Sequence, residues 1–174
     1  LMNSAGITYR IFDFAKAVVG WMRGGLAQAN IIASLIFAGM SGSAVADAAG
    51  MGAVEIEAMK KEGYDAATAG AVTAASATIG PIIPPSLPMI VYGVAAETSI
   101  GSLFIAGIIP GLLMTVALMV MVRHLAIRDH LPRHPFAGLR ALWIAFRRAF
   151  WALMAPVVLF GGLLSGVFTP TEAA

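Results

Sequence analysis

The chain has 174 residues, of which 59% are hydrophobic and only 11% are charged, and its mean hydropathy is +0.86. A soluble domain carries roughly 25% charged residues, so this composition predicts an integral membrane protein. The net charge of +2 is too small to indicate nucleic-acid binding, and the absence of cysteine excludes disulfides, thiolate metal sites and cysteine nucleophiles.

The N-terminal stretch, residues 1–23, is expected to hold the end of a preceding membrane segment followed by an amphipathic helix. From Ile7 to Arg23, apolar and charged residues alternate at helical spacing, and Trp21 lies near the end of this pattern. Such a helix is typical of the membrane–water interface. An ordinary helix outside the membrane is the alternative that the pattern leaves open.

Residues 24–46 form a charge-free run that is long enough to cross a bilayer, but it overlaps a glycine- and serine-rich segment at 39–52. Basic residues flank this region on both sides, with Arg23 before it and Lys60 after it. Because cytoplasmic loops are enriched in Lys and Arg, both flanks are expected on the same side of the membrane. Residues 24–62 are therefore predicted to form a re-entrant helical hairpin, and a plain spanning helix is the alternative.

The next membrane segment, residues 65–96, is predicted to be a broken transmembrane helix. No charge lies between Asp65 and Glu97, yet the sequence GPIIPPSLP at 80–88 places four prolines at the centre of the segment. Proline has no N–H and disfavours helical geometry in the preceding residue. Non-helical backbone at membrane depth is tolerated where it is buried in protein or lines a polar cavity, as in the binding sites of transporters.

The C-terminal part predicts two further spans separated by a basic loop. Transmembrane helices are expected at 99–122 and 149–168. The intervening residues 123–148 hold six arginines and are expected in the cytoplasm, with an amphipathic helix of their own. Residues 169–174, TPTEAA, read like the beginning of a helix, so the chain is expected to be a fragment of a longer polypeptide.

The two breaks are expected to meet near the middle of the membrane and to form an ion site. The hairpin tip at residues 41–43 and the proline loop at 80–86 would each leave carbonyl groups unpaired, and Ser41, Ser43 and Ser86 add hydroxyls. Hard oxygen ligands without a dense set of carboxylates suit a monovalent cation such as Na+. Close packing of small residues in membrane helices is the alternative reading of both breaks.

Asp47 follows the predicted tip by one helical turn. A carboxylate inside a membrane is usually functional, as an ion ligand or a proton carrier, although capping of the next helix or contact with water remains open. The apolar segments contain no histidine, and the chain has no HExxH motif and no Walker lysine, so neither an enzyme nor ATP-driven transport is predicted. The alternative to a secondary transporter is an ion channel or a passive membrane scaffold with re-entrant loops.

Five segments resemble the large membrane subunit of tripartite ATP-independent periplasmic (TRAP) transporters, the DctM-like family. They are GMSGSAVADAAGMG at 39–52, AMKKEGYDAATAGAV at 58–72, GPIIPPSLPMIVYG at 80–93, LFIAGIIPGLL at 103–113 and FTPTEAA at 168–174. The resemblance implies an all-α integral membrane protein, an inverted-repeat secondary transporter of the elevator type. Each repeat would hold a hairpin and a broken helix, and this chain would be the first repeat, with 169–174 opening the second.

The resemblance also implies a multi-pass protein of the bacterial inner membrane that couples Na+, without ATP, to the uptake of small organic acids such as C4-dicarboxylates or sialic acids. A periplasmic binding protein (DctP-like) would deliver the acid, and a small membrane subunit (DctQ-like) would complete the transporter. Two overlapping sets of site residues are expected in this chain. The Na+ set is Ser41, Gly42, Ser43, Asp47, Gly80 and Pro81, and the substrate set is Ser43, Pro84, Pro85 and Ser86.

Overall fold

The computed structural model describes residues 6–129, 131, 135 and 137–165, and these residues form helices and turns with no β-strand among them. The described helices are α1 (Ile7–Val19), α2 (Gly25–Ser41), α3 (Ala44–Gly50), α4 (Gly52–Lys61), α5 (Ala66–Ala77), α6 (Leu87–Ala95), α7 (Ile100–Arg128) and α8 (Leu139–Leu164). The all-α part of the expected fold class is confirmed. The expectations for residues 1–5 and for the second-repeat start at 169–174 lie outside the described residues.

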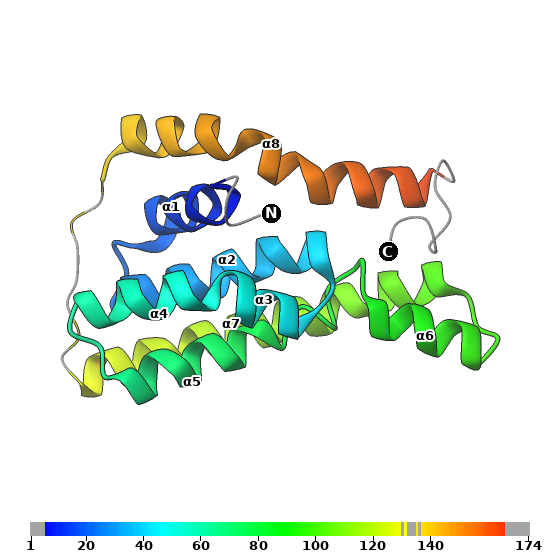
Figure 1. Cartoon of the computed structure of the whole chain (residues 1–174), viewed down its shortest axis with the longest axis horizontal. Helices are drawn as coiled ribbons and strands as arrows, with labels where there is room; N and C mark the ends of the chain where they lie inside the picture. Colours follow the sequence, from blue (N-terminus) through cyan, green and yellow to red (C-terminus); the bar gives the residue numbers. More distant parts are fainter. Residues whose placement is uncertain (1–5, 130, 132–134, 136, 166–174) are drawn as a thin grey trace.

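Helices α2, α3 and α4 form a hairpin. The chain leaves α2 at Ser41, turns at Gly42 and Ser43, and returns through α3 and α4 alongside α2 (Figure 1). At the open end of this hairpin, Nζ of Lys16 on α1 lies 3.1 Å from Oε1 of Glu62, just beyond α4. Both ends of the hairpin therefore lie at the same end of the molecule.

Helices α5 and α6 are separated by the non-helical residues 78–86. Asp65 begins α5, because its carboxylate accepts hydrogen bonds from the N–H groups of Ala67 (3.0 Å) and Thr68 (3.3 Å). Pro88 lies in the first turn of α6, where its missing N–H leaves no hydrogen bond unmade. Helix α5 packs mainly against α2 and α4, whereas α6 packs against α7, which also contacts α5.

Helices α7 and α8 are the two helices that, by length and composition, are long and apolar enough to cross a membrane among the described residues. Only 22% and 11% of their most apolar windows are buried, so both present apolar side chains outward. Their bounds differ from the expected ones, since α7 continues to Arg128 and α8 begins at Leu139 and continues past residue 149. The sequence LRALWIAFRRAF contains no glycine or proline that would end the helix, so α8 is continuous through it. Helix α8 bends near its middle (Figure 1), and it contains Pro156, a residue type that commonly bends helices.

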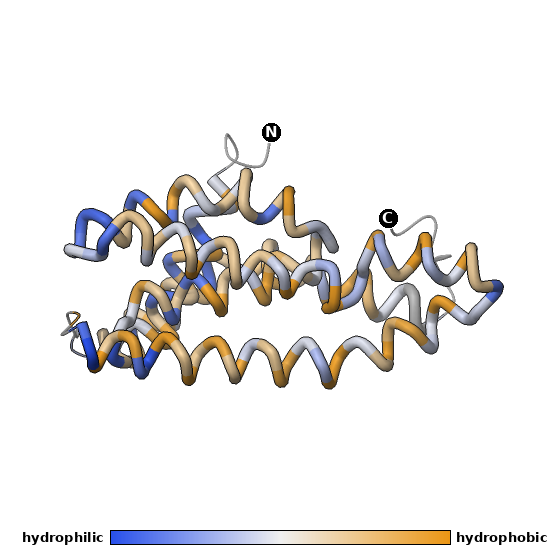
Figure 2. Tube along the Cα trace, turned by 90° about the horizontal axis from the view of Figure 1, so that it is seen from below, coloured by the Kyte–Doolittle hydropathy of each residue, from blue (hydrophilic) through white to orange (hydrophobic). Residues whose placement is uncertain are grey.

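The hydrophobic core lies mainly between α1, α2, α4 and α5. Its members include Ile11, Phe12, Leu26, Ile31, Phe37, Met51, Met59 and Tyr64. Hydrophilic residues gather at one end of the molecule, around the C-terminal end of α7, and the length of α7 beyond that end is mainly hydrophobic (Figure 2). This distribution suits a protein whose long axis crosses a bilayer.

Candidate functional site

The tip of the hairpin and the proline loop are in direct contact. A Cβ added to Gly42 would overlap the carbonyl oxygen of Pro85, and a Cβ added to Gly80 would lie 3.2 Å from the backbone carbon of Ser43. The contact is thus made by backbone on both sides, with one glycine contributed by each break. Figure 1 shows the break between α2 and α3 beside the segment that joins α5 to α6.

Gly42 can hold this position because it has no side chain. Its φ of +58° lies in the left-handed region, and its N–H donates to the carbonyl of Ala38, which ends α2. Any other residue would have to adopt this backbone conformation and also displace the Pro85 carbonyl. Both the left-handed backbone conformation and the close approach of the Pro85 carbonyl therefore require glycine at this position.

The serines of the two breaks hold the starts of the returning helices. Ser43 accepts a hydrogen bond from the N–H of Ala46 (3.3 Å), and Ser86 accepts one from the N–H of Met89 (3.3 Å). Ser86 also donates to the carbonyl of Pro81 (2.6 Å) and is fully buried, whereas the Ser41 hydroxyl accepts from the N–H of Ser43 at 3.4 Å. The expected site serines are therefore fixed by local backbone contacts, which orient them at the breaks.

Helix α7 supports the far side of the proline loop. A Cβ on Gly107 would clash with the carbonyl oxygen of Ile82, and one on Gly111 would clash with the side chain of Ile83. The two glycines lie one turn apart on α7, and their lack of side chains allows the loop to pack closely against the helix. Pro84 lines an apolar cavity of about 440 Å³ between α2, α7 and α8, so its ring belongs to the apolar side of the loop.

Four helix ends converge where the breaks meet. Helices α2 and α5 end at the contact, and α3 and α6 begin there. The C-terminal end of a helix carries about half a negative charge in exposed carbonyls, and the N-terminal end a similar positive charge in exposed N–H groups. The arrangement can therefore attract a small cation to the carbonyl ends and an anionic group to the N–H ends.

A buried polar network joins the hairpin to the first half of the broken helix. Asn30 donates to the Thr73 hydroxyl (2.7 Å) and accepts from the Ser76 hydroxyl (2.6 Å), and Ser34 donates to Ser76 (3.1 Å). All four residues are buried. Because these groups satisfy one another away from water, they fix the register of α2 against α5.

Two buried carboxyl groups lie on the returning arm of the hairpin. Asp47 and Glu55 are 2% and 1% exposed, and none of their carboxyl oxygens has a hydrogen-bond partner among the described residues. Asp47 faces the Ser34 hydroxyl, which donates to Ser76 instead, and Glu55 is close enough to Asp47 for the two charges to interact. Burying two like charges is costly, so this region favours a cation or protons.

The structure brings the expected residues Gly42, Ser43, Gly80 and Pro85 into contact, and it places Ser41, Pro81 and Ser86 within the same two breaks. It also reveals Glu55 and the Asn30 network, which the sequence did not single out. The sequence contains one indication that Glu55 faces the same way as Asp47. Glu55 is spaced four and eight residues from Met51 and Asp47, and that spacing places all three on one face of a helix.

Comparison with known proteins gives a consistent result. A family model described as the DctM component of the tripartite ATP-independent periplasmic transporter matches residues 1–174. The chain is 53% identical over 174 residues to the sialic acid TRAP transporter permease protein SiaT of Haemophilus influenzae and to the sialic acid TRAP transporter large permease protein SiaM of Vibrio cholerae. It is 44% identical over 173 residues to the C4-dicarboxylate TRAP transporter large permease protein DctM of Pseudomonas aeruginosa.

These matches cover 100%, 100% and 99% of this chain, but only 28%, 41% and 40% of the respective relatives. The chain therefore spans well under half of the length of each relative. The relatives supply the names of whole permeases, and this chain corresponds to one part of such a protein.

Proposed function

This chain belongs to the DctM family of TRAP transporters, and we propose that it forms part of the membrane permease of a Na+-coupled importer of small organic acids. The resemblance expected from the five sequence segments is thereby confirmed, and the family makes the chain a membrane protein of the transporter class. The coupling ion, the substrate and the partners belong to the proposal.

One observation carries the proposal, namely the backbone contact between Gly42 and Pro85. It brings together two helix C-termini and two helix N-termini, which supply the fields that a cation and a carboxylate need. We assign the Na+ site to the carbonyl ends beside Ser41, Gly42, Ser43, Gly80 and Pro81. Asp47, one turn away, supplies the negative charge that balances the ion.

The substrate is assigned to the N–H side of the same contact. The relatives are named for sialic acid and for C4-dicarboxylates, and these compounds share a carboxylate group. Such a group suits the start of α6, where Ser86 is the capping residue, together with Ser43, Pro84 and Pro85. Because Na+ and the carboxylate would bind at adjacent helix ends, each would increase the affinity for the other.

The hairpin enters the membrane and returns to the same side in this proposal. The contact between Lys16 and Glu62 is consistent with both ends lying at the basic, cytoplasmic face of the bacterial inner membrane. The rest of the permease would supply a second, inverted repeat and move with this one in an elevator motion. A DctQ-like subunit and a DctP-like binding protein would complete the system that delivers the acid.

The test is uptake by the full-length permease, reconstituted with its small subunit and binding protein in proteoliposomes. Uptake is expected to require a Na+ gradient, to proceed without ATP, and to fail in Ser43→Leu, because the larger side chain fills the contact between tip and loop. Ser102→Leu is the matched control, since Ser102 is exposed on α7 away from both breaks. Na+-dependent uptake that survives Ser43→Leu would remove the tip from the ion site.

A further inference from the structure

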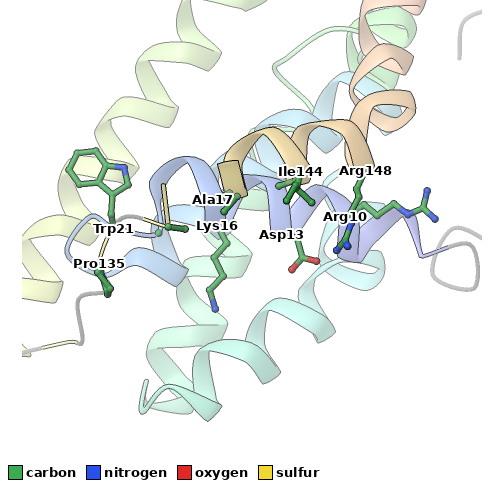
Figure 3. Close-up of a pocket in the computed structure, with 12 residues that line it drawn as sticks. Arg10, Asp13, Lys16, Ala17, Trp21, Pro135, Ile144 and Arg148 are labelled. Atoms are coloured by element: carbon green, nitrogen blue, oxygen red, sulfur yellow. The ribbon is translucent and has the colours of Figure 1, made fainter. Parts of the chain in front are cut away.

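A cavity of about 600 Å³ lies between α1 and the first half of α8, away from both helix breaks. Arg10 and Lys16 enter it from α1 and Arg148 from α8. Among the described residues that line it, Asp13 is the only acidic one, and Trp21 lies at one end (Figure 3). The cavity is thus built by two helices that are distant in sequence. A volume of this size accommodates a small organic ligand.

The cationic charge of this cavity is only partly compensated. Lys16 pairs with Glu62 at 3.1 Å, but neither Arg10 nor Arg148 forms a salt bridge with any described residue. Both arginines lie toward the end of the cavity that is farther from Trp21 (Figure 3). Guanidinium groups bind phosphate through paired N–H donors, so two of them on one cavity form a receptor for a phosphate group.

An apolar aromatic surface lies on the opposite side of the contact between α1 and α8 from this cavity. Phe14 and Val18 of α1 and Trp143 and Phe146 of α8 line a second cavity of about 590 Å³. Phe146 packs between Phe14 and Trp143, with ring centroids 6.1 and 5.8 Å apart, and the Trp143 side chain remains 61% exposed. In a membrane protein, exposed tryptophan beside basic residues is typical of the headgroup region, where lipid chains begin.

From this arrangement we propose that the cavity between α1 and α8 binds the headgroup of an anionic phospholipid of the phosphatidylglycerol type. Arg10 and Arg148 hold the phosphate, and the Asp13 carboxylate accepts hydrogen bonds from the headgroup hydroxyls. The exposed Trp143 and the neighbouring Phe146 place this pair of helices at the level of the membrane where lipid headgroups lie. The excess of positive charge favours this lipid over zwitterionic phosphatidylethanolamine. The bound lipid would contact both α1, which precedes the hairpin, and α8, which is the last described helix.

The experiment measures lipid retention by the full-length permease, purified in detergent and titrated with phosphatidylglycerol or phosphatidylethanolamine, using native mass spectrometry and thermal unfolding. The wild-type protein is expected to retain phosphatidylglycerol more tightly. The double variant Arg10→Gln/Arg148→Gln should lose at least about fivefold in affinity for it, the value of a single basic residue near an anionic surface. The control Arg123→Gln/Arg140→Gln removes the same charge from exposed positions that do not line the cavity, and it should change the affinity less than twofold.

Three results would overturn the proposal. If both double variants lost the same affinity for phosphatidylglycerol, the lipid would be held by the general positive charge of the surface. If the wild-type protein retained phosphatidylglycerol and phosphatidylethanolamine equally, the charge of the lipid would play no role. Displacement of the lipid by an equal concentration of glycerol phosphate would indicate a site for a soluble anion. If the glutamine variant does not fold, Arg10→Lys/Arg148→Lys decides instead, because it keeps the charge but loses the paired N–H donors. Its affinity for phosphatidylglycerol should be lower than that of the wild type, and an unchanged affinity counts against the site.

Discussion

Gly42 lies against the carbonyl group of Pro85, and this contact joins the hairpin tip to the proline loop. Gly42 has a left-handed backbone with φ of +58°, and a Cβ at this position would overlap the Pro85 oxygen. Since Pro85 lies in the segment seated on Gly107 and Gly111 of α7, the tip, the loop and the long helix form one continuous stack. A displacement of the tip would therefore require the proline loop to move as well.

The first prediction separates the packing of Gly42 from its backbone conformation. Gly63 also has a positive φ, +89°, but nothing lies within 4 Å of an added Cβ there. Both Gly42→Ala and Gly63→Ala carry the left-handed cost of about 1–2 kcal/mol, and only Gly42→Ala must also part the tip from the loop. In proteoliposomes, Gly63→Ala should keep Na+-dependent uptake, and Gly42→Ala should lose at least about tenfold, which corresponds to ~1.4 kcal/mol. Equal losses from the two substitutions would contradict the contact as the functional element.

The breaks were predictable from local chemistry, but the burial of individual side chains was not. Gly42 and Pro84 are residues that end helices, so the positions of the interruptions follow from composition alone. By contrast, Glu55 and Glu57 are two residues apart on α4, and their surroundings differ completely. Glu55 is 1% exposed, while the Glu57 side chain is 68% exposed and pairs with Lys61. Which face of α4 is buried depends on the positions of α2 and α5, and that information is tertiary.

The second prediction concerns the buried network between α2 and α5. Asn30→Ala removes the donor to the buried Thr73 hydroxyl, whereas Ser76 keeps its bonds to Ser34 and to the Thr73 carbonyl. A buried polar group left unpaired costs about 1–3 kcal/mol. Thr78→Ala is the control, because the exposed Thr78 hydroxyl donates only to the nearby Ala75 carbonyl. Thermal unfolding in detergent should show a clear decrease in Tm for Asn30→Ala and little change for Thr78→Ala. A similar Tm for the two variants would mean that the network does not hold α2 against α5.

The third prediction tests the buried carboxyl groups of the hairpin. Asp47→Asn should raise the Na+ concentration that gives half-maximal uptake, because it removes the charge that balances the ion in our proposal. It should not lower Tm measured without Na+, since the buried carboxylate has no hydrogen-bond partner among the described residues. Glu57→Gln is the control and should leave both quantities unchanged, because Glu57 is a surface residue. An unchanged Na+ dependence in Asp47→Asn would exclude this carboxylate from the ion site.

The fourth prediction compares two capping serines. Ser86 and Ser99 each accept a hydrogen bond from the N–H three residues ahead, at 3.3 Å in both cases, and loss of such a cap costs about 1 kcal/mol. Only Ser86 is fully buried and also donates to the Pro81 carbonyl. Ser86→Ala should therefore lower Tm more than Ser99→Ala, because it also removes the hydrogen bond to the partly buried Pro81 carbonyl, which contributes about 1 kcal/mol to the free energy of unfolding. Comparable decreases would show that the Pro81 contact contributes little to the loop.

The fifth prediction addresses the membrane path of the hairpin, using the absence of cysteine from this chain. Single cysteines at Arg23 and Lys60, introduced after any cysteines elsewhere in the full-length protein are replaced, should react with an impermeant thiol reagent from the cytoplasmic side. Glu97→Cys, in the turn between α6 and α7 at the opposite end of the molecule (Figure 1), should react from the periplasmic side. The pairing of Lys16 with Glu62 places Arg23 and Lys60 near one end of the hairpin, so a re-entrant path requires them to label together. If they label from opposite sides, the segment spans the membrane, and the Na+ site proposed at its tip would lose its position at mid-membrane.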